Sequence, residues 1–440
     1  MSDVSDWPTV LLKHLQAPKK YALNGGPFGS KLVRRDYTPS GIPVIRGKNL
    51  SCDSRFNLED LAFVSEEKAD ELLPNNAHPG DLVFTQRGTL GQVGIIPKCC
   101  GYNRFVISQS QMKLTVDQTK ADSYFLYYYF RTSETVHTIQ SLAISSGVPH
   151  INLDILRHFK IQLPPLPTQR KIAAVLSAYD DLIENNTRRI ALLEQTAQIL
   201  YREWFVHFRF PGHESVPLVE SELGPIPEGW KITAISEAAD VFRGRSYRSA
   251  NLVKEGSLPF LNLKCIKRDG GFRYDGLKRY AGKYKDTQKA KPGDIIVAVT
   301  DMTQERRIVA RAARVPDIGE EPFVFSMDLV KVVPKENVPL NYLYGMLRFS
   351  HFPDAVKQYA SGVNVLHLRP SSIAEFEFAL APRKLRERYA VLVSAIYKQC
   401  DILQKKNGIL RCARDLLLPR LISGQLDVSE LEILTGEFGQ

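Results

Sequence analysis

The feature that most constrains this chain is that it repeats itself. Four short segments recur in the same order, about 215 residues further along the chain. The pairs are "IPVIRGKNL" from Ile42 and "LPFLNLKCI" from Leu258, "PGDLVFT" from Pro79 and "PGDIIVAVT" from Pro292, "FVISQ" from Phe105 and "FVFSM" from Phe323, and "SGVPHINLDIL" from Ser146 and "SGVNVLHLRP" from Ser361. Shared strand and turn chemistry is the alternative explanation. The constant order and spacing favour two copies of one folding unit.

Each copy ends in a stretch suited to one long helix. After Pro167, 38 residues follow without proline or glycine and end at Phe205. A helix of that length measures about 57 Å at ~1.5 Å per residue. The second copy continues similarly from Arg383 and contains one glycine, Gly408, before Pro419. We therefore expect two helices that exceed the usual length of a helix in a globular protein.

Apolar residues recur along both stretches in alternating steps of three and four, which is a seam with a period of 3.5. Such a seam needs a partner helix, so we expect the two helices to pair with each other in antiparallel orientation. Polar positions such as Asn186, Gln399 and Lys406 would fix the register. Packing of each helix on its own globular domain is the alternative. The expected pairing residues are Ile172, Leu176, Tyr179, Ile183, Asn186, Ile190 and Leu193 in the first helix, and Leu385, Tyr389, Leu392, Ile396, Leu403 and Leu410 in the second.

The segments before each helix indicate mixed α and β structure. Short apolar runs such as "DLVFT" and "DIIVAVT" are bounded by Gly, Pro and Asp, which is typical of strands. The segments from Ala121 and from Leu340 have helical periodicity. We expect an α+β protein in which two similar mixed α/β domains are separated by two long antiparallel helices, with approximate two-fold symmetry.

The bulk properties point to a cytoplasmic protein with an anionic partner. The chain has 440 residues and a formal net charge of +10. No apolar run approaches the ~18 residues of a membrane span. The N-terminus carries no basic-then-apolar signal. The six cysteines form no CxxC pair, so we expect reduced thiols and no metal site.

The excess positive charge is concentrated between Arg243 and Lys291, where 14 Lys or Arg occur against four Asp or Glu. Aromatic residues, Gly and Asn are interleaved with these cations, which suits phosphate contact and base reading. A solvated basic face is the alternative, but the first copy carries basic residues at the matching place. The candidate DNA-binding residues are Lys31, Arg34, Arg35, Arg46, Lys48, Arg87, Arg104, Arg243, Arg245, Arg248, Lys264, Lys267, Arg268, Arg273, Lys278 and Arg279.

Several motifs resemble the specificity subunit of type I restriction–modification systems, and the resemblance covers nearly the whole chain. The motifs are "GPFGSKL" from Gly26, "LPPLPTQRKIAAVLSAYDDLIENN" from Leu163, "LYREWF" from Leu200, "GPIPEGW" from Gly224 and "LLLPRLISGQL" from Leu416. The second copy departs from the first of these motifs, because its counterpart reads "VFRGRSYR" from Val241.

The resemblance implies two target-recognition domains, each of which reads one half of a split, asymmetric DNA sequence. It implies that the helices set the spacer between the halves and bind two methylation subunits, through which restriction subunits join. Trp204, Phe205 and Leu421 would then lie in or near the partner-binding part, with core packing as the alternative for the two aromatic residues. The expected boundaries are 1–163 and 211–380 for the recognition domains, 164–210 and 381–424 for the helices, and 425–440 for a tail.

The sequence contains no motif for catalysis of its own. The Asn- or Asp-Pro-Pro-aromatic loop of an amino-methyltransferase and the GxxxxGK[ST] loop of an ATPase are both absent. Asp81 and Lys113 are the nearest approach to a nuclease site, and for Asp294 in the second copy we expect no matching lysine. We expect no catalytic or metal-binding residues and no cofactor in this chain. S-adenosylmethionine, ATP and magnesium would belong to the partner subunits. The alternatives are a stand-alone DNA methyltransferase and a coiled-coil scaffold that does not bind DNA.

Overall fold

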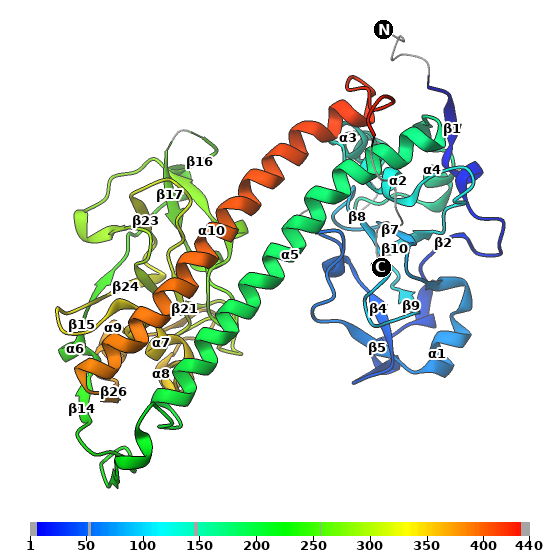
Figure 1. Cartoon of the computed structure of the whole chain (residues 1–440). Coiled ribbons are helices and arrows are strands. Elements are labelled where there is room, and N and C mark those ends of the chain that lie inside the picture. The colour runs from blue at the N-terminus through cyan, green and yellow to red at the C-terminus, as the bar shows by residue number, and fades with distance from the viewer. Residues whose placement is uncertain (1–6, 52–53, 145–147, 256, 433–440) are drawn as a thin grey trace. The chain divides into compact units, whose positions relative to one another are not determined.

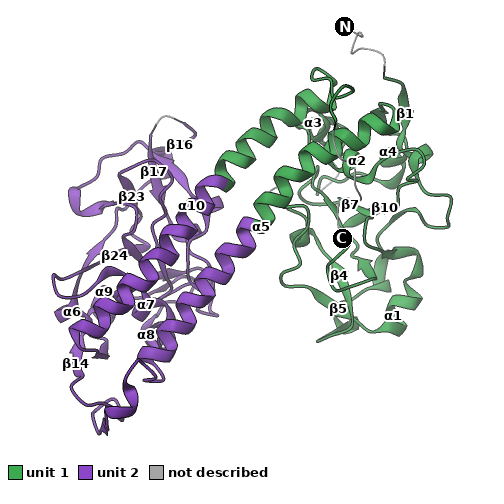
Figure 2. Ribbon diagram, in the orientation of Figure 1, with its two compact units in different colours: residues 1–185, 407–440 green, residues 186–406 purple. Residues whose placement is uncertain are grey.

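The computed structural model describes residues 7–51, 54–144, 148–255 and 257–432. Ser146, where the fourth repeated segment starts, and the end of the 425–440 tail lie outside these residues. The chain forms two compact units (Figure 2). Unit 1 comprises residues 1–185 and 407–440, and unit 2 comprises residues 186–406. Each unit therefore combines a globular part with a part of each long helix.

Unit 1 contains two main β-sheets (Figure 1). One has five strands in the order β3-β5-β4-β9-β6, and the other has four in the order β2-β10-β7-β8. β4 and β9 are parallel, and the other neighbours are antiparallel. β1 and β11 form a separate antiparallel pair. The strands are β1 (Thr9–Leu11), β2 (Leu23–Gly25), β3 (Tyr37–Thr38), β4 (Ile42–Ile45), β5 (Ala62–Val64), β6 (Asn76–Ala77), β7 (Leu82–Thr85), β8 (Val93–Ile95), β9 (Phe105–Ile107), β10 (Gln111–Leu114) and β11 (Lys160–Gln162).

Unit 2 contains a five-stranded sheet in the order β16-β18-β17-β23-β19 and a four-stranded sheet in the order β15-β24-β20-β22. β17 and β23 are parallel. Two-stranded pairs join β14 to β26, β12 to β13 and β21 to β25. The strands are β12 (Leu218–Val219), β13 (Ile226–Pro227), β14 (Lys231–Ala234), β15 (Ala239–Arg243), β16 (Leu252–Val253), β17 (Leu258–Leu261), β18 (Lys278–Tyr280), β19 (Lys289–Ala290), β20 (Ile295–Ala298), β21 (Thr300–Asp301), β22 (Ala312–Arg314), β23 (Phe323–Phe325), β24 (Leu329–Pro334), β25 (Leu366–His367) and β26 (Glu377–Leu380).

The two units share one topology. In chain order, each strand of the main sheets of unit 1 has a counterpart in unit 2 with the same neighbours, including the one parallel pair of each unit. Three of the repeated sequence segments fall on matching strands, which are β4 with β17, β7 with β20 and β9 with β23. The expected α+β class and the internal repeat are confirmed.

The shorter helices pack around the sheets. The helical segment expected from Ala121 is divided in two, because the Thr132 hydroxyl accepts a hydrogen bond from the Thr135 amide (3.3 Å) and caps a new helix. These helices are α1 (Glu66–Glu71), α2 (Ser123–Tyr129), α3 (Ser133–Ser141), α4 (Leu153–Arg157), α6 (Ile235–Ala238), α7 (Leu340–Phe349), α8 (Phe352–Val356) and α9 (Pro370–Ala374).

The two long helices are α5 (Leu166–Phe205) and α10 (Arg383–Ile422), with 40 residues each. Within unit 1, Arg414 meets Asp180, and Asn407 donates a hydrogen bond to the Ile183 carbonyl (3.4 Å). Residue numbers rise on α5 as they fall on α10, so the two segments are antiparallel there. α10 continues through Pro419 to Ile422, because a proline in the last turn removes only one backbone donor.

On α10, Tyr389 and Leu403 of the expected seam are buried, but at two other positions the buried residue is displaced by one. Leu392 is exposed and Val393 is buried in its place, and likewise Lys406 is exposed and Asn407 is buried. The buried residues of α10 still recur with a period of 3.5, because one row of them lies at steps of seven: Arg386, Val393, Cys400, Asn407, Arg414 and Leu421. No helix among the described residues is long and apolar enough to cross a membrane.

Candidate nucleic-acid interface

In unit 1, three loops leave from one edge of the sheets. β10 begins where β2 and β7 end, because Met112 pairs with Gly25 and Gln111 pairs with Thr85. β4 ends at the same edge, since the Ser108 amide just after β9 donates to the Ile45 carbonyl (2.9 Å). The segments that follow β2, β4 and β7 therefore start close together.

Most of the candidate cations of unit 1 lie on these three segments. Lys31, Arg34 and Arg35 are exposed between β2 and β3. Arg46 and Lys48 follow β4, and Arg87 is exposed after β7. Topology thus brings to one edge cations that are more than 50 residues apart in sequence.

Three of the unit 1 candidates already have partners. Arg46 donates to the Asp60 carbonyl (2.8 Å), and the Lys48 ammonium lies 3.3 Å from the Asp60 carboxylate. Arg104 forms an ion pair with Asp70 (2.6 Å) just before β9, at the opposite end of that strand. Arg104 is therefore the candidate of unit 1 that the structure separates from the others.

The equivalent edge of unit 2 is built in the same way. Val330 of β24 pairs with Arg243 at the end of β15 and with Val297 of β20. The Ser326 amide after β23 donates to the Leu261 carbonyl at the end of β17 (2.8 Å). The segments after β15, β17 and β20 therefore leave from this edge.

The candidate cations of unit 2 follow β15 and β17. Arg243 and Arg248 are exposed, and Arg245 is half-buried with its Nε atom buried and without a hydrogen-bond partner. The candidates that follow β17 and are exposed are Lys264, Lys267, Arg268, Arg273 and Lys278. Arg273 is paired with Asp275 (2.6 Å), and the half-buried Arg279 is paired with Glu320 (2.7 Å).

Both edges depend on a glycine at the same place. A Cβ atom on Gly26 would lie 2.1 Å from the Ser108 carbonyl oxygen, and one on Gly244 would lie 2.0 Å from the Ser326 carbonyl oxygen. Backbone atoms cannot give way at such distances. The second copy therefore keeps the structurally required glycine although the rest of its "GPFGSKL" motif has changed.

The sequence did not single out two arginines at this edge. Arg306 and Arg307 lie in the segment after β20, which corresponds in topology to the segment after β7 that carries Arg87. The dipeptide "RR" was visible in the sequence, but it lies outside the basic region that ends at Lys291. Only the strand order shows that the two regions meet.

One expectation about catalytic residues is corrected. Asp294 does have a matching lysine, because the Lys331 ammonium on β24 lies 3.9 Å from its carboxylate. Lys331 occupies the position that Lys113 occupies on β10, next to Asp81. Burial lowers the pKa of Lys113, against the opposing effect of Asp81. The Lys–Asp couple is buried in unit 1 and half-buried in unit 2, and its recurrence makes it part of the shared fold.

The three residues suggested for partner docking are buried in the cores of the units. Trp204 and Phe205 pack with Tyr389 in unit 2 at ring-centroid distances of 6.2 and 5.1 Å. Leu421 is fully buried in unit 1. The core-packing alternative describes their environment, and a partner could reach them only by displacing these side chains.

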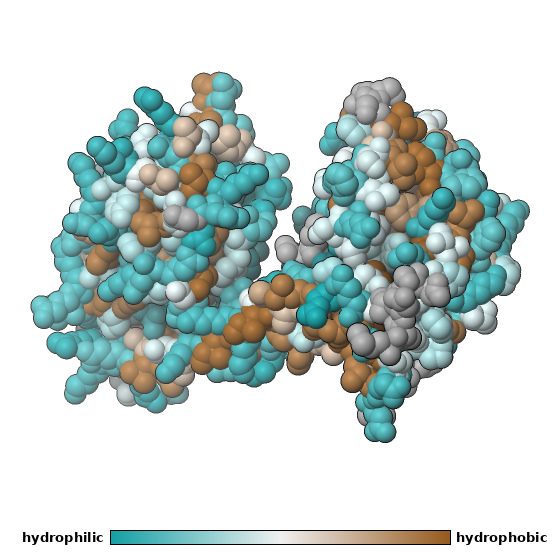
Figure 3. Space-filling model, turned by 90° about the horizontal axis from the view of Figure 1, so that it is seen from above, coloured by the Kyte–Doolittle hydropathy of each residue, from teal (hydrophilic) through white to brown (hydrophobic). Residues whose placement is uncertain are grey.

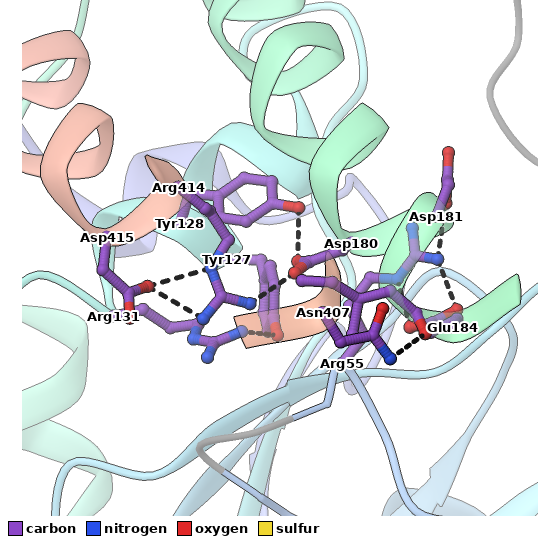
Figure 4. Close-up of polar contacts among 11 residues, drawn as sticks. Arg55, Tyr127, Tyr128, Arg131, Asp180, Asp181, Glu184, Asn407, Arg414 and Asp415 are labelled. Carbon is purple, nitrogen blue, oxygen red and sulfur yellow. Dashed lines mark hydrogen bonds and ion pairs between the residues drawn. The ribbon is translucent and has the colours of Figure 1, made fainter. Parts of the chain in front are cut away.

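A polar network in unit 1 holds the globular part on α5 (Figure 4). Arg55 follows β4 and lies 2.5 Å from both Asp181 and Glu184 of the helix. In unit 2, Arg314 of β22 pairs with Asp401 of α10 (2.6 Å). Glu184 and Asp401 occupy the same position in their two 40-residue helices. The same position of each long helix therefore anchors an arginine of the adjoining domain.

Comparisons with known proteins agree with this architecture. The model of the type I restriction modification DNA specificity domain matches residues 36–195. The MjaIX specificity subunit of a type I restriction enzyme from Methanocaldococcus jannaschii is 26% identical, over 97% of this chain and 95% of its own length. The HindI specificity subunit from Haemophilus influenzae is 22% identical, over 87% of this chain and 92% of its own.

A solved structure supports the fold. The S subunit of a type I restriction–modification system from M. genitalium matches with a TM-score of 0.54 at 16% identity, covering 94% of this chain and 96% of that one. Both chains therefore share one fold. Over nearly its whole length the chain is similar to specificity subunits of type I restriction–modification systems, the family that its motifs resemble.

Proposed function

We propose that this chain recognises a bipartite, asymmetric DNA target and directs the methylation and restriction subunits of a type I complex to it. The observation that carries the proposal is the repeated sheet edge: in both units, segments that are distant in sequence bring exposed cations to the same place in the fold. Two copies with one topology and different side chains at that edge are suited to two different half-sites. Phosphate contacts by these cations would fix the protein on the duplex.

The partners and cofactors follow from the same proposal. Two methylation subunits bind this chain, and restriction subunits join through them in the cytoplasm of a prokaryotic cell. S-adenosylmethionine, ATP and magnesium bind to those partners, so adenine methylation and DNA cleavage are activities of the complex. Nothing among the described residues favours a stand-alone methyltransferase or a scaffold that does not bind DNA.

The proposal is tested by a gel-shift experiment with the chain and its methylation subunits. We expect a shift of target duplex whose strength falls steeply as salt rises, because bound cations release counterions from DNA. Absence of any salt-sensitive shift would favour the scaffold alternative. Transfer of labelled methyl groups by the purified chain alone would favour the methyltransferase.

We further propose that the long helices set the number of base pairs between the half-sites. Inserting four residues, about one helical turn, near Asn186 and another four near Asn407 would lengthen both helices together. The expected result is a changed spacer in the methylated motif. An unchanged spacer would refute this role of the helices.

A further inference from the structure

In unit 2, the segment after β20 is held in a defined shape by one buried carboxylate. Asp301 is fully buried and accepts hydrogen bonds from the Thr303 amide (2.9 Å), the Thr303 hydroxyl (2.9 Å) and the Ile308 amide (2.7 Å). The Val309 amide also donates to it (3.2 Å). The segment from Met302 to Arg307 is therefore a fixed feature of the surface.

A second loop, between Ser361 and His367, contacts the segment after β20. Ser361 and His367 exchange two backbone hydrogen bonds (3.1 and 2.9 Å), which closes a loop with Val363 near its tip. The Gln304 side chain donates to the Val363 carbonyl (2.5 Å), so the two loops are joined. β25 at the end of this loop also pairs with β21 at the start of the first.

The joined loops expose apolar side chains that the fold does not use. Val363 is 89% exposed, and Met302 and Tyr359 are each 67% exposed. Figure 3 shows hydrophilic residues over most of the visible surface of unit 2, with hydrophobic residues between them. Met302 and Val363 lie on the two joined loops, and Tyr359 lies just before the second loop. Exposed apolar side chains that gather in one place mark a candidate contact surface. Arg306 and Arg307 lie on the same feature. Arg306 is held by Gln358 (3.0 Å), and Arg307 pairs with Glu305 (2.5 Å).

Unit 1 carries a version of this feature at the matching place. Arg87, just after β7, bridges to His150, and His150 also bridges to Ile144. Val148 of this loop is 57% exposed. Both recognition edges therefore present a valine on a loop that is tied to the arginine-bearing segment after the same strand.

We propose that Val363 and Val148, which are the same residue of the repeated segment, make the same apolar contact with a DNA base, each in the half-site bound by its own unit, whereas the side chains that differ between the units distinguish the two half-sites. This inference rests on the proposed function. DNA is the occupant that fits, because the loops start at the edge that carries the exposed cations and have arginines beside the apolar tip. Apolar side chains read the methyl group of thymine in the major groove or wedge between base steps in the minor groove.

An apolar base contact has a signature that distinguishes it from a phosphate contact. Removing a cation that touches phosphate weakens binding to every sequence and lowers the salt dependence by about one unit of slope. Removing an apolar base contact weakens binding only to the correct sequence and leaves the salt dependence unchanged, since no counterion is involved. The substitution Val363→Ser should leave the fold and its stability unchanged, because the side chain is almost fully exposed.

The test uses the full-length chain with its methylation subunits and the target duplex found by methylome sequencing. Two further duplexes carry one scrambled half-site each. We expect Val363→Ser to weaken binding to the target about tenfold, with an unchanged salt slope. We expect it to have no effect on the duplex in which the half-site of unit 2 is scrambled. Val148→Ser should show the same pattern for the other half-site.

The control is Leu218→Ser, which alters another exposed side chain of unit 2 (58%) on β12 and should bind like wild type. Wild-type affinity of both valine variants overturns the inference, as does equal weakening on all three duplexes. Loss of methylation-subunit binding with unchanged DNA affinity also overturns it, since the loops would then contact protein. Failure of the wild-type complex to prefer its target would instead refute the proposed function.

Discussion

Asp180 and Arg414 form a buried ion pair in unit 1 that has no counterpart among the described residues of unit 2. The guanidinium Nη1 of Arg414 lies 2.5 Å from a carboxylate oxygen of Asp180, and the two side chains are 4% and 5% exposed. Tyr128 donates a hydrogen bond to the other carboxylate oxygen (2.7 Å). Burial lowers the pKa of Arg414, but the neighbouring Asp180 outweighs this effect and the pKa is raised overall. The arginine is therefore charged in the core.

The equivalent positions of the other long helix are not ionic. Tyr397 of α10 corresponds to Asp180 of α5, and Ala197 of α5 corresponds to Arg414 of α10. Tyr397 packs against Tyr344 in unit 2 with ring centroids 5.5 Å apart. The same fold thus tolerates uncharged residues at these positions. The ion pair is a feature of unit 1 that the shared fold does not require.

Replacing one member of this ion pair should destabilise the protein more than expected from replacing both members together. Arg414→Leu should lower the free energy of unfolding by about 3–5 kcal/mol, because it leaves Asp180 as an uncompensated buried charge. Asp180→Leu should cost less, because Asp415 still pairs with Arg414 (2.8 Å). The double variant should lose much less than the sum of the two. Denaturant unfolding of the four proteins measures this, and additive losses would contradict the account of the pair.

Two helical glycines should respond in opposite directions to alanine. A Cβ atom added to Gly345 of α7 would lie 2.4 Å from the Tyr201 ring and 3.0 Å from the Tyr389 hydroxyl. Gly345→Ala should therefore destabilise the protein by about 1–3 kcal/mol through overpacking. Gly408 of α10 has no atom within 4 Å of such a Cβ. Gly408→Ala should stabilise by up to about 1 kcal/mol.

Thermal unfolding of the two glycine variants provides the measurement. The pair serves as its own control, since both changes add one methyl group to a helix. If Gly345→Ala were as stable as Gly408→Ala, the close packing of α5 on α7 would be wrong.

The cations at the edge of unit 2 should control salt-dependent binding. Changing Arg245 and Arg248 together to alanine should weaken binding to all duplexes, because fewer phosphates are neutralised. The slope of log K against log salt should fall by about 0.9 for each phosphate that the variant leaves without a cation. Arg104→Ala is the matched control, because Arg104 is already paired with Asp70 away from the edge of unit 1. If Arg104→Ala weakened DNA binding as much as the double variant of Arg245 and Arg248, the edge of unit 2 would not be the DNA interface.

Asp301 should stabilise unit 2 in a pH-dependent way. Burial raises its pKa, but the hydrogen bonds from Ile308 and Thr303 outweigh burial, so the pKa is lowered overall. A carboxyl whose folded pKa is depressed contributes stability that is fully present above its unfolded pKa of about 3.9. That stability is lost as the pH falls through the folded value.

Asp301→Asn should therefore lower the free energy of unfolding by about 1.5–3 kcal/mol at pH 7. The difference from wild type should shrink below about pH 4. Denaturant unfolding at several pH values measures this, with Asp269→Asn as the exposed control. A difference that stays constant down to acid pH would show that the charge of Asp301 does not hold the loop.

Much of the fold could be predicted from the sequence because the repeat is a global constraint. Matching segments such as Ile42–Ile45 and Leu258–Leu261 required two copies of one topology, and the long stretch without glycine or proline required a long helix. The seam on α10 was misplaced at Leu392, because a helix that packs on several neighbours buries a wider face than a two-helix seam does.

The candidate site was harder to predict because it is assembled by strand order. Arg306 and Val363 lie outside the basic stretch, and only the pairing of β21 with β25 brings their loops together. The side chains suggested for docking, such as Trp204, were assigned from motif resemblance, whereas their aromatic neighbours bury them. Sequence composition identifies the charge of a region, but not which regions share an edge.

We propose that two similar units recognise two different half-sites on DNA. Methylome sequencing of a host that carries this chain and its methylation subunits tests it most directly. We expect methylation within a motif of two unlike half-sites, separated by a fixed number of unspecified base pairs. A single contiguous motif, or no methylation that depends on this chain, would contradict it.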